Sequence, residues 1–152
     1  MVETVQWREY QSDIIGRATN ILKTKNFVYL AMEVRTGKTL TSLGICEKMG
    51  AENVLFLTKK KAVQSISDDY DKLCPIGFTL FTINYESMHK APNLKWNLII
   101  CDEAHSLGAF PKPNNRSKAV RDLILKTKAK VILLSGTPTP ESYSQMYHQI
   151  YG

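Results

Sequence analysis

The sequence predicts an α/β fold with a mostly parallel central sheet, and three observations support this. Short apolar runs without polar alternation, such as residues 54–58, are typical of strands buried on both faces of a parallel sheet. Segments with apolar residues at helical spacing separate these runs. The sequence Gly-Lys-Thr at residues 37–39 follows one run and precedes a helical segment, which is the arrangement of a phosphate-binding loop.

The composition is that of one soluble globular domain. The chain has 152 residues, of which 43% are hydrophobic and 22% charged. No apolar run approaches the roughly 20 residues that cross a bilayer, and the first residues lack the apolar block of a signal peptide. Three cysteines lie far apart without metal-type pairing, which suits a reducing compartment. We therefore expect a cytoplasmic protein without a membrane partner, with the nucleoid or nucleus possible through DNA binding.

The net charge of +6 and the pI of about 9.2 favour a polyanionic partner such as nucleic acid. Many soluble domains are equally basic and have no such partner, so charge alone leaves this open.

The first predicted elements are a helix over residues 8–23 and a strand over residues 27–32. The helix begins with aromatic and amide side chains around Tyr10 and Gln11. These side chains either pack on the sheet or form an adenine pocket in which Gln11 pairs with the base edge.

The segment after this strand carries the phosphate-binding pattern. Lys38 is placed to reach the β- and γ-phosphates, Thr39 to give a hydroxyl to magnesium, and Gly37 lets the backbone approach an anion. The strict pattern begins with glycine where this chain has Met32, so an ordinary turn is the alternative. The following helix, residues 38–49, ends at Gly50.

A strand over residues 54–58 leads directly into Lys59, Lys60 and Lys61, and a helix follows to Leu73. Lysines at a helix N-terminus oppose the helix dipole, by about 0.3–1 kcal/mol each. A bound anion would relieve this cost; a solvated run that tolerates it is the alternative. Another strand is predicted over residues 78–85.

The apolar run that ends at residue 101 is followed by Asp102 and Glu103. At a strand tip both carboxylates can address one site, where Asp102 can hold magnesium through water and Glu103 can orient or deprotonate an attacking water. The alternative is that the pair caps the next helix.

The remaining elements are a surface loop over residues 108–115, a helix capped by Ser117, and a strand over residues 130–134 that leads into Ser135-Gly-Thr-Pro. A tyrosine stripe at residues 143, 147 and 151 is expected to pack. The phosphate loop, the acidic pair and the Ser-Gly-Thr-Pro turn all follow strands. Since ligands bind beyond the carboxyl ends of parallel strands, we expect one site there.

These motifs resemble, in order, the Q-like motif and motifs I, II and III of superfamily-two helicases: Tyr10-Gln11, Thr36-Gly-Lys-Thr39, Asp102-Glu-Ala-His105 and Ser135-Gly-Thr-Pro138. Residues 84–88 and 96–105 are most similar to the Swi/Snf-type branch of DNA translocases and remodellers, in which motif I need not begin with glycine. The resemblance covers residues 6–151. It implies a RecA-like P-loop three-layer sandwich, with residues 1–152 forming a single lobe.

The resemblance also implies ATP and magnesium as cofactors and assigns roles to individual residues. The implied nucleotide-binding residues are Gln11 on adenine and Arg35, Thr36, Gly37, Lys38 and Thr39 around the phosphates. The implied magnesium ligands are Thr39 and Asp102, and the implied catalytic residues are Lys38, Asp102 and Glu103.

Two further groups follow from the resemblance. His105, Ser135 and Thr137 would couple the nucleotide state to nucleic-acid contact. Lys59, Lys60, Lys61, Asn84 and Tyr85 would contact the backbone of a nucleic acid, with DNA as the expected partner, which would make binding salt-dependent and largely independent of sequence.

Two features depart from the family pattern. Arg35-Thr36 replaces the Gly-Leu usual in the Swi/Snf branch. The chain also ends after motif III, whereas family members carry a second RecA-like lobe, in cis or in trans, with arginines worth about 10³–10⁵ in rate. We therefore expect an ATP-binding helicase lobe that is not a competent motor by itself. The alternatives are a nucleotide-dependent binding or regulatory module, or a phosphate-loop ATPase that acts on something other than nucleic acid.

Overall fold

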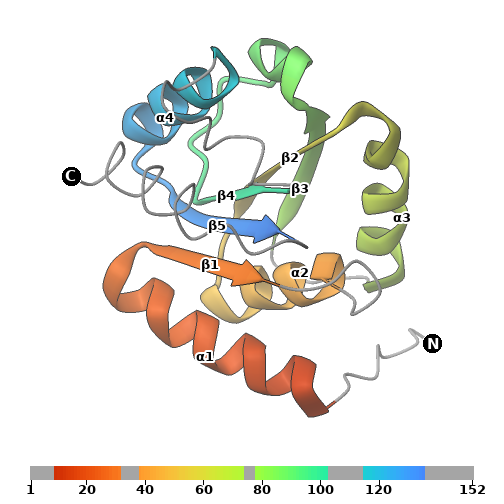
Figure 1. The fold of residues 1–152 in the computed structure, drawn as a ribbon, viewed down its shortest axis with the longest axis vertical. Coiled ribbons are helices and arrows are strands. Elements are labelled where there is room, and N and C mark those ends of the chain that lie inside the picture. The colour runs from red at the N-terminus through yellow and green to blue at the C-terminus, as the bar shows by residue number, and fades with distance from the viewer. Residues whose placement is uncertain (1–8, 32–37, 74–77, 103–114, 136–152) are drawn as a thin grey trace.

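The computed structural model describes residues 9–31, 38–73, 78–102 and 115–135, which form alternating strands and helices (Figure 1). The strands are β1 (Phe27–Ala31), β2 (Asn53–Thr58), β3 (Thr79–Asn84), β4 (Leu98–Cys101) and β5 (Lys130–Ser135). The helices are α1 (Glu9–Lys25), α2 (Lys38–Met49), α3 (Val63–Leu73) and α4 (Asn115–Thr127), with two short 3-10 helices, η2 (Lys60–Ala62) and η3 (Tyr85–Lys90).

The five strands form one sheet in the order β1-β5-β4-β2-β3, and every neighbouring pair is parallel. This confirms the predicted parallel sheet. Because all strands run the same way, their carboxyl ends meet at one edge and their amino ends at the other. The order also places β5, which is last in the chain, between β1 and β4.

Strands β1, β2, β4 and β5 bury side chains on both faces of the sheet, whereas the side chains of the edge strand β3 are only partly buried or exposed. In β2, Val54 and Phe56 pack with residues from α1, α2 and α3, whereas Leu55 and Leu57 pack with residues from α4 and η3. Figure 1 shows α1 and α2 on one side of the sheet and α4 on the other. This double burial explains the apolar runs without alternation, and it produces the predicted three-layer sandwich.

Helix boundaries agree with the predictions with one exception. Gly50 ends α2 with φ of 68°, and its N–H donates to the Glu47 carbonyl at 3.1 Å while the Ala51 N–H donates to the Cys46 carbonyl at 3.3 Å. This is the Schellman arrangement expected of a terminal glycine. The predicted cap at Ser117 is wrong, because α4 begins at Asn115 and Ser117 lies within its first turn.

Candidate functional site

The carboxyl ends of the five strands form one row. Ala31 at the end of β1 is the register partner of Ser135 at the end of β5, and Thr58 of β2 is the partner of Asn84 of β3. Asp102 extends β4 by one residue, since its N–H donates to the Leu57 carbonyl at 2.8 Å. The structure therefore brings the start of the phosphate loop, the start of the Ser-Gly-Thr-Pro turn and the first acidic residue to one edge.

Asp102 is held from two sides. Its side chain is buried, and the Thr58 hydroxyl donates to Asp102 Oδ2 at 2.8 Å. The Tyr85 hydroxyl donates to the Asp102 backbone carbonyl at 2.6 Å. The side-chain bond orients the carboxylate, and the backbone bond fixes the strand end that carries it.

Sequence reasoning missed Thr58 and assigned Tyr85 a different role. The sequence around Thr58 shows only a hydroxyl that follows the apolar run of residues 54–57, which does not by itself indicate a contact with Asp102. Tyr85 was expected to contact nucleic acid, but only 5% of it is exposed and it packs in the core cluster that includes Leu57 and Cys101. Tyr85 therefore packs in the core and contacts the strand end that carries Asp102.

The N-terminus of α2 lies at the same edge because α2 follows β1 across the phosphate-loop segment. Thr39 is half-buried in its first turn, and the Ser42 hydroxyl donates to the Thr39 carbonyl at 2.7 Å. No acidic residue occupies this turn. A helix N-terminus carries about half a positive charge, so this end suits a phosphate group.

The lysine run also begins at this edge. Lys59, Lys60 and Lys61 follow β2 and are exposed. Asn84 is half-buried at the end of β3, and its side-chain amide donates to Glu86 Oε2 at 3.1 Å. These residues form a basic and polar border next to the strand ends that hold Asp102.

Several predicted site residues lie outside the described residues, and for three others only the backbone is described. The first group is Arg35, Thr36, Gly37, Glu103, His105 and Thr137, and the tyrosine stripe at residues 143, 147 and 151 lies outside as well. The second group is Gln11 in α1, Lys38 at the start of α2 and Ser135 at the end of β5.

The donor set at the edge suits a hard cation. A carboxylate from Asp102 and a hydroxyl from Thr39 are oxygen ligands of the kind that magnesium prefers. Within the described ranges, no group of three His, Cys, Asp or Glu side chains could hold a metal ion. Burial, and then the charge of Asp102, raise the pKa of the Cys101 thiol, so Cys101 stays protonated and is not a ligand of the thiolate type.

A five-stranded parallel sheet, helices on both faces and a row of polar strand ends beside a helix N-terminus define a RecA-like α/β lobe. The chain belongs to the SNF2-related domain family, whose model matches residues 53–150, well over half of the sequence. A second family model, for the res subunit of type III restriction enzymes, matches residues 4–75.

Solved structures share this fold at low sequence identity. The SWI2/SNF2 ATPase core of Sulfolobus solfataricus, in complex with double-stranded DNA, matches 99% of this chain with a TM-score of 0.74 and 17% identity. The Hef helicase domain of Pyrococcus furiosus matches 95% with a TM-score of 0.67 and 17% identity. A nuclease-deletion mutant of the type ISP restriction-modification enzyme LlaGI, in complex with a DNA substrate mimic, matches 88% with a TM-score of 0.64 and 17% identity.

This chain spans only part of each of these structures: 36% of the SWI2/SNF2 core, 36% of the Hef domain and 18% of LlaGI. No curated protein matched the sequence significantly. Among the described helices, none has the length and apolar character needed to span a bilayer.

Proposed function

We propose that this chain is the ATP-binding N-terminal lobe of a Swi/Snf-like DNA helicase or translocase, which couples ATP hydrolysis to movement on nucleic acid. The observation that carries the proposal is the position of Asp102. It is buried at the end of β4, it accepts a hydrogen bond from Thr58, and it shares an edge with the strand end that precedes the phosphate loop. Motif II and motif I of a helicase require this proximity.

On the nucleotide side, the N-terminus of α2 and Lys38 bind the phosphates, with Arg35, Thr36 and Gly37 beside them, and Gln11 recognises adenine. Thr39 and Asp102 hold magnesium, which neutralises phosphate charge when it is bound. Glu103 follows Asp102 in the chain and orients the attacking water. Thr58 keeps the Asp102 carboxylate in one orientation while these groups assemble.

On the nucleic-acid side, Lys59, Lys60, Lys61 and Asn84 contact the phosphate backbone of DNA. Their exposure or partial exposure at the border of the same edge supports this role. His105, Ser135 and Thr137 couple the two sides. Two of the solved structures that share the fold are complexes with DNA, which supports DNA as the partner.

A second RecA-like lobe, in cis or in trans, completes the motor. The chain spans 36% of the SWI2/SNF2 core that it resembles, which leaves room in such a protein for another lobe. Without the arginines of that lobe we expect nucleotide binding with little turnover, because such an arginine contributes about 10³–10⁵ in rate.

The nucleotide site is tested by titrating magnesium ADP calorimetrically into the chain and into Lys38→Ala and Asp102→Asn. We expect weak binding, with a Kd of about 1 mM, which corresponds to about 4 kcal/mol. Lys38→Ala should abolish it, and Asp102→Asn should remove its dependence on magnesium. Lys23→Ala, an exposed change on α1, is the matched control and should bind normally. Equal binding by all four proteins would overturn the assignment.

The DNA site is tested separately by fluorescence anisotropy with a labelled duplex at several salt concentrations. Neutralising Lys59, Lys60 and Lys61 together should weaken binding. The slope of the logarithm of the binding constant against the logarithm of the salt concentration should become less steep by about three. Neutralising the exposed Lys23, Lys25 and Lys72 changes the net charge equally and should have a smaller effect. Nucleotide binding without salt-dependent DNA binding would favour the regulatory-module alternative, or an ATPase that acts on something other than nucleic acid.

A further inference from the structure

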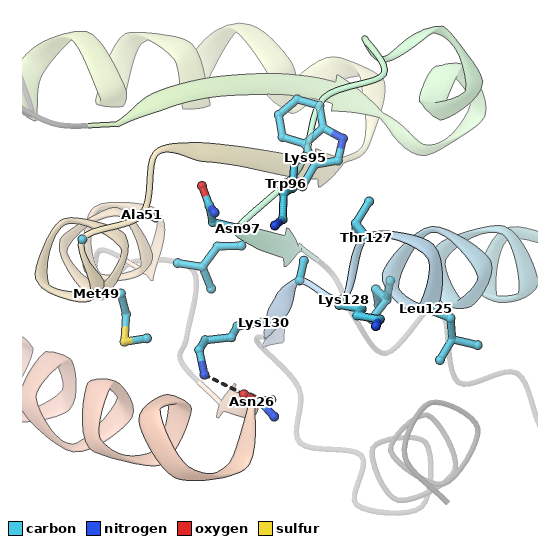
Figure 2. A pocket seen from close by; sticks show the side chains of 14 residues that line it. Asn26, Met49, Ala51, Lys95, Trp96, Asn97, Leu125, Thr127, Lys128 and Lys130 are labelled. Carbon is cyan, nitrogen blue, oxygen red and sulfur yellow. Dashed lines mark hydrogen bonds between the residues drawn. The ribbon is translucent and has the colours of Figure 1, made fainter.

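A hollow of about 690 Å³ lies at the amino edge of the sheet, opposite the site described above. The residues that precede four strands line it: Asn26 before β1, Ala51 before β2, Asn97 before β4 and Ala129 before β5. Figure 2 shows Asn26 and Lys130 on one side of it and Leu125 and Lys128 on another. Its volume is in the range of ligand and peptide pockets, and the proposed motor function does not use it.

Three helices end around this hollow. Asn26, Gly50 and Lys128 follow α1, α2 and α4 and have φ of 63°, 68° and 57°, the left-handed conformation that ends a helix. The Asn26 N–H donates to the Leu22 carbonyl at 3.2 Å and the Lys128 N–H to the Ile124 carbonyl at 2.8 Å. The carbonyl ends of helices carry partial negative charge, which disfavours an anion deep in the hollow.

Lys130 offsets part of this negative charge within the fold. Its ammonium group donates to the Leu22 carbonyl at 2.7 Å and to Asn26 Oδ1 at 2.6 Å (Figure 2). Both bonds hold the end of α1 to the start of β5. Lys130 is therefore a structural residue of the hollow.

Lys95 and Lys128 are different. Both line the hollow and are exposed, and neither forms an ion pair with a residue in the described part of the chain. Among the described residues that line the hollow, none is acidic. Two cations on the border of a hollow without a carboxylate favour a partner that brings the negative charges itself.

The interior of the hollow is largely apolar. Leu98 and Ile124 line it but are almost fully buried, whereas Met49 is half-buried and Leu125 is 51% exposed although it is a large hydrophobic residue. Removing such surface from water is favourable in proportion to the apolar area that is covered. A small inorganic anion has no apolar group to cover it, and a nucleic-acid backbone offers only the carbons of its sugars.

We propose that this hollow is a docking site for a protein segment in which an apolar anchor residue is flanked by acidic residues. The anchor covers Met49 and Leu125, and its acidic neighbours pair with Lys95 and Lys128. The two lysines favour a partner with negative charge, and the apolar surface favours a peptide that has an apolar side chain. Because the hollow lies opposite the phosphate-loop edge, such a partner can bind while nucleotide and DNA occupy the other edge.

The test uses a fluorescein-labelled probe peptide in which leucine pairs alternate with glutamate pairs, and two comparison probes. One comparison peptide replaces glutamate with glutamine, and the other replaces leucine with serine. Amide chemical shifts of the isotope-labelled chain locate binding. We expect the leucine-glutamate probe alone to shift the amides of Ala51, Asn97 and Lys128, and the double variant Lys95→Glu, Lys128→Glu to weaken its affinity by about tenfold or more.

The matched control reverses Lys23 and Lys72, which are exposed elsewhere and give the same net charge. It should bind the probe as the parent does. Equal loss in this control, or equal binding of the leucine-free peptide, would show general charge attraction and overturn the proposal. Shifts of these amides by a duplex oligonucleotide in place of the peptide would assign the hollow to nucleic acid, and no shifts with any probe would mean that it is not a binding site.

Discussion

The Thr58 hydroxyl lies 2.8 Å from Asp102 Oδ2, and this hydrogen bond joins the carboxyl ends of the neighbouring strands β2 and β4. Both side chains are buried, with exposed fractions of 0% for Thr58 and 4% for Asp102. A buried carboxylate is costly unless hydrogen bonds compensate for lost water, so Thr58 both stabilises Asp102 and selects its orientation.

Replacing Thr58 by valine keeps the shape of the side chain and removes the donor. We expect the free energy of unfolding to fall by about 1–3 kcal/mol, because Asp102 keeps its burial and loses a compensating bond. Urea unfolding followed by circular dichroism measures this change. Magnesium-dependent ADP binding should weaken as well.

The variant Thr58→Ser distinguishes the effect of losing the hydrogen bond from the effect of losing packing. It retains the donor and loses one methyl group, which costs about 0.8 kcal/mol. Nucleotide binding should stay close to that of the parent. If serine and valine weakened binding equally, the Thr58 hydroxyl would have no part in orienting Asp102.

Tyr85→Phe removes the hydroxyl that donates to the Asp102 carbonyl at 2.6 Å and leaves the ring in place. We expect a loss of about 0.5–1.5 kcal/mol in unfolding free energy. The predicted nucleic-acid role gives a different outcome, in which DNA affinity falls and stability does not. Measuring urea unfolding and duplex anisotropy on the same variant decides between the two.

Replacing each of two glycines by alanine should change the stability of the fold in opposite directions. A Cβ added at Gly16 or at Gly50 would meet no atom within 4 Å, so neither change causes a clash. Gly16 lies inside α1, where alanine should stabilise the fold by about 0.4–1 kcal/mol. Gly50 has φ of 68°, where alanine should destabilise it by about 1–2 kcal/mol. Thermal unfolding of both variants tests this, and shifts of the same sign would contradict the assigned end of α2.

The buried thiols should make stability fall at alkaline pH. Burial raises the pKa of Cys46, and burial together with the Asp102 charge raises the pKa of Cys101. Thiols of the unfolded chain ionise with a pKa of about 8.5, so above that pH the folded state binds more protons and the free energy of unfolding decreases. Their contribution is complete below this pH and decreases above it.

The size of this effect follows from two thiols that stay protonated. Between pH 7 and pH 9.5 the parent should lose about 3 kcal/mol more than a variant with alanine at both positions. Urea unfolding at the two pH values measures the difference. An equal pH dependence in parent and variant would mean that the thiols ionise in the folded state.

The sequence predicted the parallel sheet because a strand that is buried on both faces has apolar residues at consecutive positions, as β2 does. It also predicted the shared edge, since the polar residues follow the strands along the chain. Gly50 was recognisable because a left-handed helix end strongly favours glycine.

Contacts between segments that are far apart in the chain could not be predicted in this way, because no local sequence pattern indicates them. The pairing of Thr58 with Asp102 spans 44 positions, and nothing local distinguishes this threonine from any other at a strand end. The sequence does not indicate that Tyr85 is buried. The strand order β4-β2-β3 brings it close to Asp102, whose backbone carbonyl accepts its hydrogen bond. The amino-edge hollow depends on three helix ends that converge only in the folded chain.

The pairing of β1 with β5 has a consequence for how the protein is made. Within the described part of the chain, β1 pairs with β5 alone, in a register that runs from Phe27↔Val131 to Ala31↔Ser135. A ribosome therefore releases β1 long before its partner strand exists, and the phosphate-loop edge is assembled only after residue 135 has emerged. Since contacts so far apart in sequence form slowly, the nascent chain exposes an unpaired apolar strand at least until β5 has emerged.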